Sequence, residues 1–323
     1  MKILIAHNNY QIAGGEDSVL ANEHALLTAK GHTVLLYCVN NDSITATLDK
    51  ILAALGVVFS ISQYIKFKKY LKLEIPDVVH VHNYFPVLSP AIFYACKHVG
   101  IPVVHTLHNY RAVCPTAILM HNRKIIERSI TGNAWWAVPE KVYRDSILGT
   151  LALTLMVEIH KRIGTWQSKV DKYIALTNTS KNKFIEAGWP ESKLELKPNF
   201  IDDPFHGRQA FTLLGGFALY VGRLREEKGI NILIDSWEDV NFPLKIIGDG
   251  PLKDKVDKSP ISTIEYLGYK DRLEVIELLL NADFIIMPSI CYETFGMVII
   301  EAFACGTPVI VSKLGSLQTL VEN

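Results

Sequence analysis

Two glutamates, Glu293 and Glu301, stand with seven residues between them in the stretch FIIMPSICYETFGMVIIEAFACGTPVIV, residues 284–311. The stretch reads as strand, polar loop, apolar helix and strand. Eight positions equal about two helical turns, which would place both carboxylates on one helix face. The expected helix start would offer unpaired N–H groups to an anion, at Thr294, Phe295 and Gly296. A solvated Glu301 and a Glu293 favoured only by the helix dipole would explain the same pattern.

Two further loops of the C-terminal half carry charge or glycine directly after a β-rich run. Residues 222–229 read GRLREEKG, in which Arg223 and Lys228 are spaced to converge on a diphosphate. Arginine would act there as a planar fork and lysine as a point charge. Residues 248–251 read GDGP and contribute Gly248 and Gly250. Charged loop residues are usually just solvated. These loops therefore indicate a ligand site only in combination with the glutamate pair.

The N-terminal half places a glycine pair and several histidines near its own strand ends. Gly14 and Gly15 precede a helix expected from about residue 17 to 30, and either a tight turn or a closely approaching ligand would favour glycine there. They do not complete the G-x-G-x-x-G fingerprint, which argues against a nicotinamide cofactor. His108 lies just past the strand expected at 103–107, and we favour it as a polar contact over His105. A hydrogen-bonded core role competes strongly for the other histidines, His80, His82 and His105.

These loops need a scaffold in which strand ends meet at one edge. β-rich runs alternate with helical patterns along the chain, which predicts an α/β fold with parallel sheets and ligands at the carboxyl ends of the strands. The expected strands are 2–6, 33–37, 78–82, 103–107 and 172–176, then 218–221, 244–247, 263–267, 284–287 and 309–311. A breaker-rich stretch at 194–215 separates the two series. We therefore expect one domain over residues 1–200 and a second over 201–323.

Composition narrows the class of protein. The 323 residues are 49% hydrophobic and 20% charged, and Lys+Arg equals Asp+Glu at 33 each. A general nucleic-acid binder would show a basic excess, so we expect no nucleic-acid partner. The five cysteines are scattered and show no CxxC spacing. This pattern favours a reducing compartment and argues against both a disulfide framework and a zinc site. Without a signal peptide or an apolar run long enough to span a bilayer, the expected location is the cytoplasm.

Two segments raise the question of a membrane surface. The run YIKFKKYLK contains a cluster of lysines, Lys66, Lys68, Lys69 and Lys72. A basic amphipathic helix attracts anionic lipids, but it is more often a solvated face of a domain. The apolar helix expected over 147–163 is too short to span a bilayer comfortably, and we expect it to pack across the first domain. Peripheral contact with the inner face of the cell membrane stays open.

In this order, the motifs G-R-L…K-G, G-x-G-P and E-x7-E followed by Gly-Thr-Pro-Val resemble the retaining glycosyltransferases of family 4. Those are two-domain GT-B enzymes, in which two Rossmann-like domains face a cleft. The resemblance implies that Glu293 lies against the donor sugar and that Glu301 holds the ribose hydroxyls. It also implies that Gly14 and Gly15 lie over the donor phosphates, and that His108, in VVHTLH, contacts the donor sugar.

This resemblance implies transfer of a sugar from a nucleotide diphospho-sugar to a glycan or lipid-linked acceptor, with retention of configuration, in cell-surface polysaccharide synthesis. No cofactor is implied beyond the donor. Positioned cations would stabilise the leaving phosphate, and no Asp-x-Asp pair suggests a metal. By the resemblance, the catalytic set is His108, Arg223, Lys228 and Glu293, and the donor-binding set is Gly14, Gly15, Gly248, Gly250, Thr294, Phe295, Gly296 and Glu301.

One departure from the family concerns the C-terminus. The sequence ends at Asn323, where the family normally continues, so we expect a second domain that is incomplete. Two other functions therefore stay open. A nucleotide-sugar 2-epimerase would need its own acid/base set, and the E-x7-E unit argues against it. A catalytically silent nucleotide-sugar binder would follow from the shortened domain.

Overall fold

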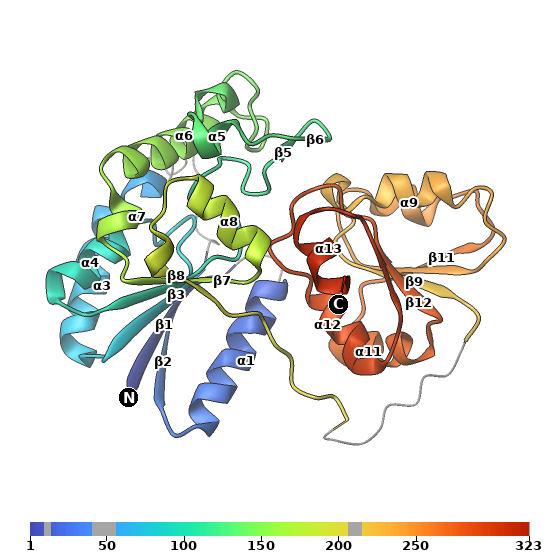
Figure 1. Cartoon of the computed structure of the whole chain (residues 1–323), viewed down its shortest axis with the longest axis horizontal. Coiled ribbons are helices and arrows are strands. Elements are labelled where there is room, and N and C mark those ends of the chain that lie inside the picture. Colours follow the sequence, from blue (N-terminus) through green and yellow to red (C-terminus); the bar gives the residue numbers. More distant parts are fainter. Residues whose placement is uncertain (10–13, 41–55, 206–214, 323) are drawn as a thin grey trace. The chain divides into compact units, whose positions relative to one another are not determined.

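The computed structural model describes residues 1–9, 14–40, 56–205 and 215–322. The chain divides into two compact units (Figure 1). The first consists of Met1–His121 and Ile126–Asn199, and the second of Asn122–Ile125 and Phe200–Asn323. Each unit contains one parallel sheet with helices packed around it, so the predicted α/β class with two Rossmann-like parallel-sheet domains is confirmed. Part of the stretch expected to join the domains, residues 206–214, lies outside the described residues.

The sheet of the first unit has six strands in the order β2-β1-β3-β4-β7-β8. All neighbouring strands run parallel. The carboxyl ends of β1, β3 and β4 therefore meet at one edge, where polar side chains lie. The strands are β1 (Lys2–Asn8), β2 (Thr33–Val39), β3 (Val78–Asn83), β4 (Val103–Thr106), β7 (Lys172–Ala175) and β8 (Leu194–Leu196).

Helices cover this first sheet on both faces (Figure 1). The first helix begins at Gly15 rather than at residue 17, so Gly15 belongs to its first turn and only Gly14 precedes it. The helices are α1 (Gly15–Ala29), α3 (Ile61–Glu74), α4 (Ala91–Val99), α5 (Arg128–Thr131), α6 (Ile147–Arg162), α7 (Thr165–Ser168) and α8 (Asn178–Glu186). Shorter elements of the first unit are β5 (Met120–His121), η1 (Trp135–Ala137) and η2 (Glu191–Lys193), whereas β6 (Lys124–Ile125) belongs to the second unit.

The sheet of the second unit has five strands in the order β11-β10-β9-β12-β13, all parallel. They are β9 (Ala218–Val221), β10 (Leu244–Ile247), β11 (Ile264–Gly268), β12 (Phe284–Met287) and β13 (Val309–Val311). The helices are η3 (Glu226–Lys228), α9 (Ile230–Ser236), α10 (Lys253–Asp257), α11 (Arg272–Asn281), α12 (Met297–Cys305) and α13 (Gly315–Val321).

The alternation of side chains along β9 directs its residues into two different core clusters of the second unit. One contains Ala218 and Tyr220 of β9, together with apolar residues of α9 and α10. The other contains Leu219 of β9 with Leu279 of α11 and Ala302 of α12. Because both faces of the strands are buried in this way, these strands read as continuous apolar runs in the sequence.

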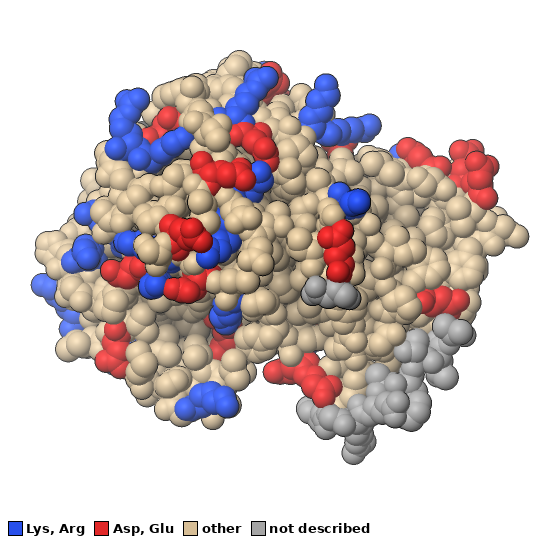
Figure 2. Space-filling model, viewed as in Figure 1, with Lys and Arg blue, Asp and Glu red and all other residues tan. Residues whose placement is uncertain are grey.

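No described helix is both long enough and apolar enough to cross a membrane. The apolar helix expected over 147–163 is α6, which buries seven of its residues within the first unit, among them Leu153, Met156 and Val157. Over the first unit, basic and acidic side chains intermingle on the face shown in Figure 2. That distribution agrees with the balanced charge of the whole chain.

Candidate functional site

Three loops of the second unit lie at the same edge of its sheet. They follow β9, β10 and β12, which are parallel neighbours with β9 in the middle. The first loop carries Arg223 and Lys228, the second Gly248 and Gly250, and the third Glu293. The topology therefore brings the charged groups predicted from the sequence to one edge, the place where parallel α/β sheets bind ligands.

An ion pair joins the first and third loops. Nζ of Lys228 lies 2.5 Å from Oε1 of Glu293, and the hydroxyl of Ser289 donates to the same oxygen at 2.8 Å. Both side chains of the ion pair are largely buried, with 19% and 14% exposed. The backbone N–H of Ile290 also donates to the carbonyl of Glu227 at 3.0 Å. Glu293 is therefore fixed from two sides, while the Arg223 side chain is exposed.

A glycine allows these two loops to meet. Gly229 follows Lys228 and has φ +73°, a left-handed conformation that favours glycine. A Cβ atom at this position would lie 1.9 Å from the carbonyl oxygen of Pro288, which is backbone and cannot move aside cheaply. Only glycine therefore lets the segment with Lys228 pack against the loop that ends in Glu293.

Gly248 and Gly250 have a structural reason to be glycine. Their φ angles are +145° and +155°, and a Cβ would lie 1.8 Å from the carbonyl oxygen of Gly222 and 2.5 Å from that of Leu224, respectively. The N–H of Leu224 donates to the carbonyl of Asp249 at 2.9 Å. These glycines therefore hold the loop of Arg223 against the loop after β10. Direct contact with a donor, as expected for Gly248 and Gly250, stays a prediction.

The interpretation of Glu293 and Glu301 as carboxylates on one helix face is wrong. The helix α12 begins at Met297, with Gly296 as its N-terminal cap residue, so Glu293 lies in the preceding loop. The helix therefore does not start at Thr294 and Phe295, and the side chain of Phe295 is only 6% exposed. Donor contact at Phe295 stays a prediction. The predicted roles of Thr294 and Gly296 in donor binding stay predictions.

Glu301 lies in α12 in a half-buried position. Burial raises the pKa of its carboxyl, and the positive charge of Arg272 opposes that rise. A half-buried carboxylate is suited to accept hydrogen bonds from hydroxyl groups, because paired donors would compensate for its lost hydration. This environment is compatible with the ribose contact that the family resemblance implies.

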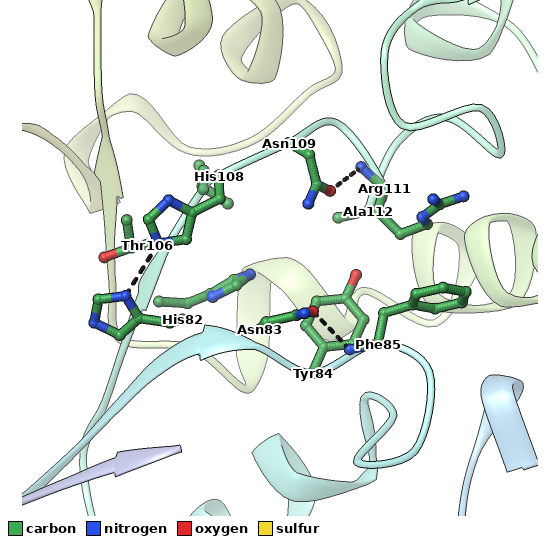
Figure 3. A pocket seen from close by; sticks show the side chains of 11 residues that line it. His82, Asn83, Tyr84, Phe85, Thr106, His108, Asn109, Arg111 and Ala112 are labelled. Carbon is green, nitrogen blue, oxygen red and sulfur yellow. Dashed lines mark hydrogen bonds between the residues drawn. The ribbon is translucent and has the colours of Figure 1, made fainter. Parts of the chain in front are cut away.

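A pocket lies at the strand edge of the first unit (Figure 3). It is lined by residues at the ends of β3 and β4 and in the loops that follow them, and its polar groups include those of His82, Asn83, His108, Asn109 and Arg111. Oδ1 of the Asn109 side chain accepts from the backbone N–H of Arg111 at 2.9 Å. The Arg111 guanidinium carbon lies 4.6 Å from the centre of the Phe85 ring. The pocket thus combines hydrogen-bonding groups with an aromatic wall, as small-molecule sites commonly do.

His108 is held by a chain of polar groups that starts at α1. Its Nε2 atom lies 3.0 Å from Nδ1 of His82. A dashed line marks this contact in Figure 3. Nε2 of His82 lies 3.2 Å from Oε2 of the buried Glu23. Nδ1 of His80 lies 3.3 Å from the same oxygen, and Nζ of Lys197 contacts the other oxygen of Glu23.

Sequence reasoning missed Glu23 and Lys197 and treated His82 only as a core group. The alternating histidines of VHVHN were the one signal available for His82. The prediction that His80 and His105 are hydrogen-bonded core groups agrees with the structure. His80 pairs with the Thr106 hydroxyl at 2.7 Å, and Nδ1 of His105 donates to the Val81 carbonyl at 2.9 Å.

Burial favours the neutral form of three of these histidines, His80, His105 and His108. Burial lowers the pKa of His80 to about 3 and that of His105 to about 4. Burial, with the neighbouring His82 as a smaller cause, also lowers the pKa of His108 well below its ordinary value. A neutral His108 has one N–H and one lone pair, so it can both donate and accept.

Glu23, His80 and His82 are close enough to be considered as metal ligands. They offer one ligand atom each, and these atoms all lie within 4.8 Å of one another. The ammonium group of Lys197, however, contacts the same carboxylate and would repel a second cation there. We therefore assign no metal to this cluster.

Gly14 stands at the N-terminus of α1 in an extended conformation. Its N–H donates to Oδ2 of Asp17 at 2.7 Å, and Nε2 of His7 lies 3.1 Å from the other oxygen of that carboxylate. Burial alone would raise the pKa of Asp17, but the hydrogen bonds from His7 and Gly14 lower it below its ordinary value. Residues 10–13 of the same loop lie outside the described part of the chain, and donor contact at Gly14 and Gly15 stays a prediction.

Two family models match the chain. The model of Glycosyltransferase Family 4 matches residues 13–204, more than half of the chain, and that of Glycosyl transferases group 1 matches residues 213–323. The uncharacterized glycosyltransferase MJ1178 of Methanocaldococcus jannaschii is 41% identical over 109 residues, 32% of this chain and 31% of that protein. A glycogen synthase of Mycobacterium tuberculosis is 29% identical over 261 residues, 77% of this chain and 55% of that protein. The matches thus span about a third to about half of these relatives.

Solved structures share the fold. The Anabaena protein Alr3699/HepE, solved in complex with UDP, has a TM-score of 0.60 at 18% identity and covers 100% of this chain and 84% of its own. WaaG, a glycosyltransferase involved in lipopolysaccharide biosynthesis, has a TM-score of 0.63 at 14% identity. The match covers 99% of this chain and 83% of the WaaG chain. Together with the family models and the two parallel-sheet units, these likenesses lead to one conclusion: the chain belongs to glycosyltransferase family 4 and has the GT-B type of fold.

Proposed function

We propose that this protein transfers a sugar from a nucleotide diphospho-sugar to a glycan or lipid-linked acceptor, with retention of configuration. The observation that carries the proposal is the loop arrangement of the second unit. There Lys228 and Glu293 are paired at 2.5 Å beside the exposed Arg223, at the carboxyl ends of parallel strands. Membership in glycosyltransferase family 4 also supports sugar transfer as the function.

In this proposal, Arg223 and Lys228 bind the diphosphate of the donor. Negative charge grows on the leaving phosphate as the glycosidic bond breaks, so cations that are already in place stabilise the transition state. Glu301 accepts hydrogen bonds from the ribose, and Glu293 and His108 contact the sugar. The two cationic side chains supply the positive charge that a metal ion would otherwise bring, and the proposed reaction is metal-independent.

The retaining course needs no nucleophile from the protein. We propose that the acceptor hydroxyl attacks from the side that the diphosphate leaves, and that the leaving phosphate accepts its proton. Glu293 accepts hydrogen bonds from Lys228 and Ser289 through the same oxygen, which suits a positioning and electrostatic role better than covalent catalysis. Retaining hydrolases instead use two carboxyl groups about 5–5.5 Å apart.

Relatives suggest which donors to test. One is named a GDP-mannose-dependent mannosyltransferase, with 34% identity over 110 residues, and Alr3699/HepE was solved with UDP-glucose as well as with UDP. The first experiment is therefore calorimetric titration of the protein with UDP-, GDP- and ADP-sugars. Arg223→Ala and Glu301→Ala are the test variants. Lys258→Ala and Glu265→Ala, at exposed positions of the same unit, are the matched controls.

The expected result is binding of one nucleotide class that both test variants weaken and both control variants leave unchanged. The protein is then incubated with a nucleotide sugar of that class and with candidate acceptors. Release of the nucleotide diphosphate measures transfer of the sugar. Binding without transfer to any acceptor would favour a silent nucleotide-sugar binder. A folded sample that binds no nucleotide sugar would contradict the proposal.

We further propose that the protein acts at the inner face of a membrane, where a lipid-linked acceptor would lie. Support comes from α3, whose N-terminal half exposes Ile61 and Ile65 on successive turns and whose last turn exposes Leu73. Exposed lysines accompany this stripe, namely Lys66, Lys69 and Lys72. Apolar side chains flanked by lysines are the composition of helices that lie on anionic lipid surfaces.

A further inference from the structure

Three segments of the first unit bring cations and aromatic rings together beside the pocket. Phe85 follows β3, Arg111 lies in the loop after β4, and Tyr143 precedes α6. The guanidinium carbon of Arg111 lies 4.6 Å from the centre of the Phe85 ring and 5.8 Å from that of Tyr143. Figure 3 shows the Arg111 side chain beside Phe85. The guanidinium carbon of Arg144 lies 5.4 Å from the centre of the same Tyr143 ring, so two cations share one aromatic surface.

Arg111 retains most of its hydrogen-bonding capacity for a ligand. A guanidinium group has five N–H donors, and Nη1 of Arg111 donates to the carbonyl of Pro115. Within residues 1–9, 14–40, 56–205 and 215–322, no carboxylate forms an ion pair with Arg111 or Arg144. The Arg111 side chain is half-buried, so an anion bound there would be partly shielded from water. Arginine is suited to such an anion, because its planar fork matches the oxygens of a phosphate or carboxylate.

The turn before α6 adds to the positive charge. Together with Arg111, its cations Lys141 and Arg144 outnumber its two carboxylates, Glu140 and Asp145, and Glu140 already contacts a histidine. Lys141, Arg144 and Asp145 have left-handed backbone, with φ +47°, +54° and +51°. This conformation is uncommon for residues other than glycine, and such residues cluster at ligand sites. Local preference therefore does not explain how this turn presents its charges.

An apolar surface follows the turn directly. The helix α6 begins at Ile147, and the side chains of Ile147 and Leu148 are 53% and 65% exposed. Trp135, which is 47% exposed, belongs to η1, and η1 packs next to α6. Contiguous exposed apolar side chains mark interaction sites. A ligand with a phosphate at one end and a hydrocarbon chain at the other would meet matching chemistry along this surface.

We propose that Arg111 and Arg144 bind the phosphate of a lipid-linked acceptor, whose hydrocarbon chain lies along Ile147 and Leu148. The inference rests on the proposed function, because it names the class of acceptor for that transfer. All four residues belong to the first unit. Arg111 donates hydrogen bonds to the phosphate, whereas the exposed Arg144 contributes mainly its charge.

Calorimetric titration of the full chain with octyl phosphate tests the proposal without a donor. Inorganic phosphate and octanol are the comparison ligands, since each lacks one end of octyl phosphate. Arg111→Gln should weaken octyl phosphate binding at least about tenfold, the loss expected for one hydrogen bond to a charged group. Arg111→Lys should lose less, because lysine keeps the charge but not the fork.

A second variant separates charge from hydrogen bonding. Arg144→Gln should weaken octyl phosphate binding several-fold at low salt and hardly at all at about 1 M salt, because salt screens exposed charges. The loss in Arg111→Gln should persist at high salt. This variant also keeps the proposal testable if Arg111→Gln does not fold. Ile147→Ser should weaken the binding of octyl phosphate but not that of inorganic phosphate.

Arg162→Gln is the matched control, since Arg162 is an exposed arginine at the other end of α6. Equal affinity of the wild-type protein, Arg111→Gln and Arg144→Gln for octyl phosphate would overturn the proposal. Inorganic phosphate or octanol that binds as tightly as octyl phosphate would overturn the lipid-linked assignment. Loss of binding in Arg223→Ala alone would overturn the site, because it would place the phosphate on the second unit.

The same titrations separate this inference from the proposed function. If octyl phosphate binds as expected but the protein transfers no sugar to any acceptor, the proposed function fails and the phosphate site stands. Transfer to a neutral glycan by a protein that does not bind octyl phosphate would overturn this inference alone.

Discussion

Lys228 already has an anionic partner before a donor binds. Its ammonium group lies 2.5 Å from Glu293, so a diphosphate must compete with that carboxylate for the same positive charge. Glu293→Gln should therefore tighten the binding of a free nucleotide diphosphate several-fold and still lower the rate of transfer. Lys228→Met should weaken the same ligand by about 1.5–3 kcal/mol, the typical contribution of a hydrogen bond to a charged group. Calorimetry with both variants checks the two directions.

Lys258→Met serves as the control for that experiment because Lys258 is an exposed lysine of the same unit. Weaker binding of the free nucleotide diphosphate by Glu293→Gln would contradict the idea of competition. It would show that Glu293 itself organises the phosphate site.

The same residues make a prediction about metal ions. In the proposed function, Arg223 and Lys228 together supply two positive charges for the donor diphosphate. We therefore expect transfer to persist after dialysis against EDTA, measured as release of the nucleotide diphosphate. Addition of Mg²⁺ should raise the activity of Lys228→Met more than that of the wild-type protein, because only the variant lacks a charge. Complete loss of wild-type activity in EDTA would contradict metal independence.

Buried neutral histidines make stability depend on pH. The pKa is about 3 for His80 and about 4 for His105 in the folded protein, against 6.5 in the unfolded chain. Between these values the unfolded state binds protons that the folded state does not, so the free energy of unfolding falls as pH falls below 6.5. Each histidine changes the free energy of unfolding by at most about 1.4 kcal/mol per pH unit. Carboxylates with lowered pKa, Glu23 and Asp17, act in the same direction but only nearer pH 4.

Urea unfolding at about pH 7, 6 and 5 measures this slope. His105→Gln should flatten it, since one proton fewer is taken up on unfolding. Equal stability at all three values would contradict the assignment of neutral buried histidines.

At the residue level, the sequence identifies groups that motifs mark and misses those that only the fold brings together. Arg223, Lys228 and Glu293 were found through ordered motifs, and the structure places them on loops at one strand edge. Glu23 and Lys197 are 174 positions apart in the chain. No local pattern connects two such residues, because their contact depends on how α1 and the end of β8 pack.

Among the elements, the loop that carries Lys228 depends on one glycine. Gly229→Ala should destabilise the protein more than Gly268→Ala does. Both positions have φ near +74°, but a Cβ at Gly268 has no neighbour within 4 Å, whereas at Gly229 it would lie 1.9 Å from the Pro288 carbonyl oxygen. The shared strain is about 1–2 kcal/mol, and overpacking adds about 1–3 kcal/mol for Gly229 alone. Urea unfolding measures the stability difference.

Nucleotide-sugar binding by the two glycine variants gives a second readout. Gly229→Ala should also weaken binding, because it separates Lys228 from Glu293. If both variants lose the same stability and neither loses affinity, the packing of these loops is not what positions the lysine.

Helix starts show why some elements could be predicted and others not. The start of α11 at Arg272 is marked by a side chain, since Asp271 accepts from the N–H of Glu274 at 3.0 Å in a capping box. The start of α12 was placed too early, because its cap residue Gly296 has no side chain to mark the position. The buried strands were easier, since both of their faces are apolar.

At the scale of the whole molecule, charge and exposure bear on the proposed membrane contact. The chain has zero formal net charge, so attraction to an anionic surface must come from a local group of lysines. The helix α3 provides such a group beside the exposed Ile65 and Leu73. Each lysine near an anionic surface contributes about 1 kcal/mol, and the contribution falls off within a Debye length.

Binding to anionic lipid vesicles should therefore weaken about 30-fold in the variant Lys69→Gln, Lys72→Gln, as measured by sedimentation. Raised salt should weaken the wild-type protein similarly, and Ile65→Ser should weaken binding even at high salt, because its contribution is apolar. Lys253→Gln, Lys258→Gln on and beside α10 is the matched control. Binding that neither the α3 variants nor salt changes would place the membrane contact elsewhere. No binding to anionic vesicles by the wild-type protein would argue for a soluble glycan as the acceptor.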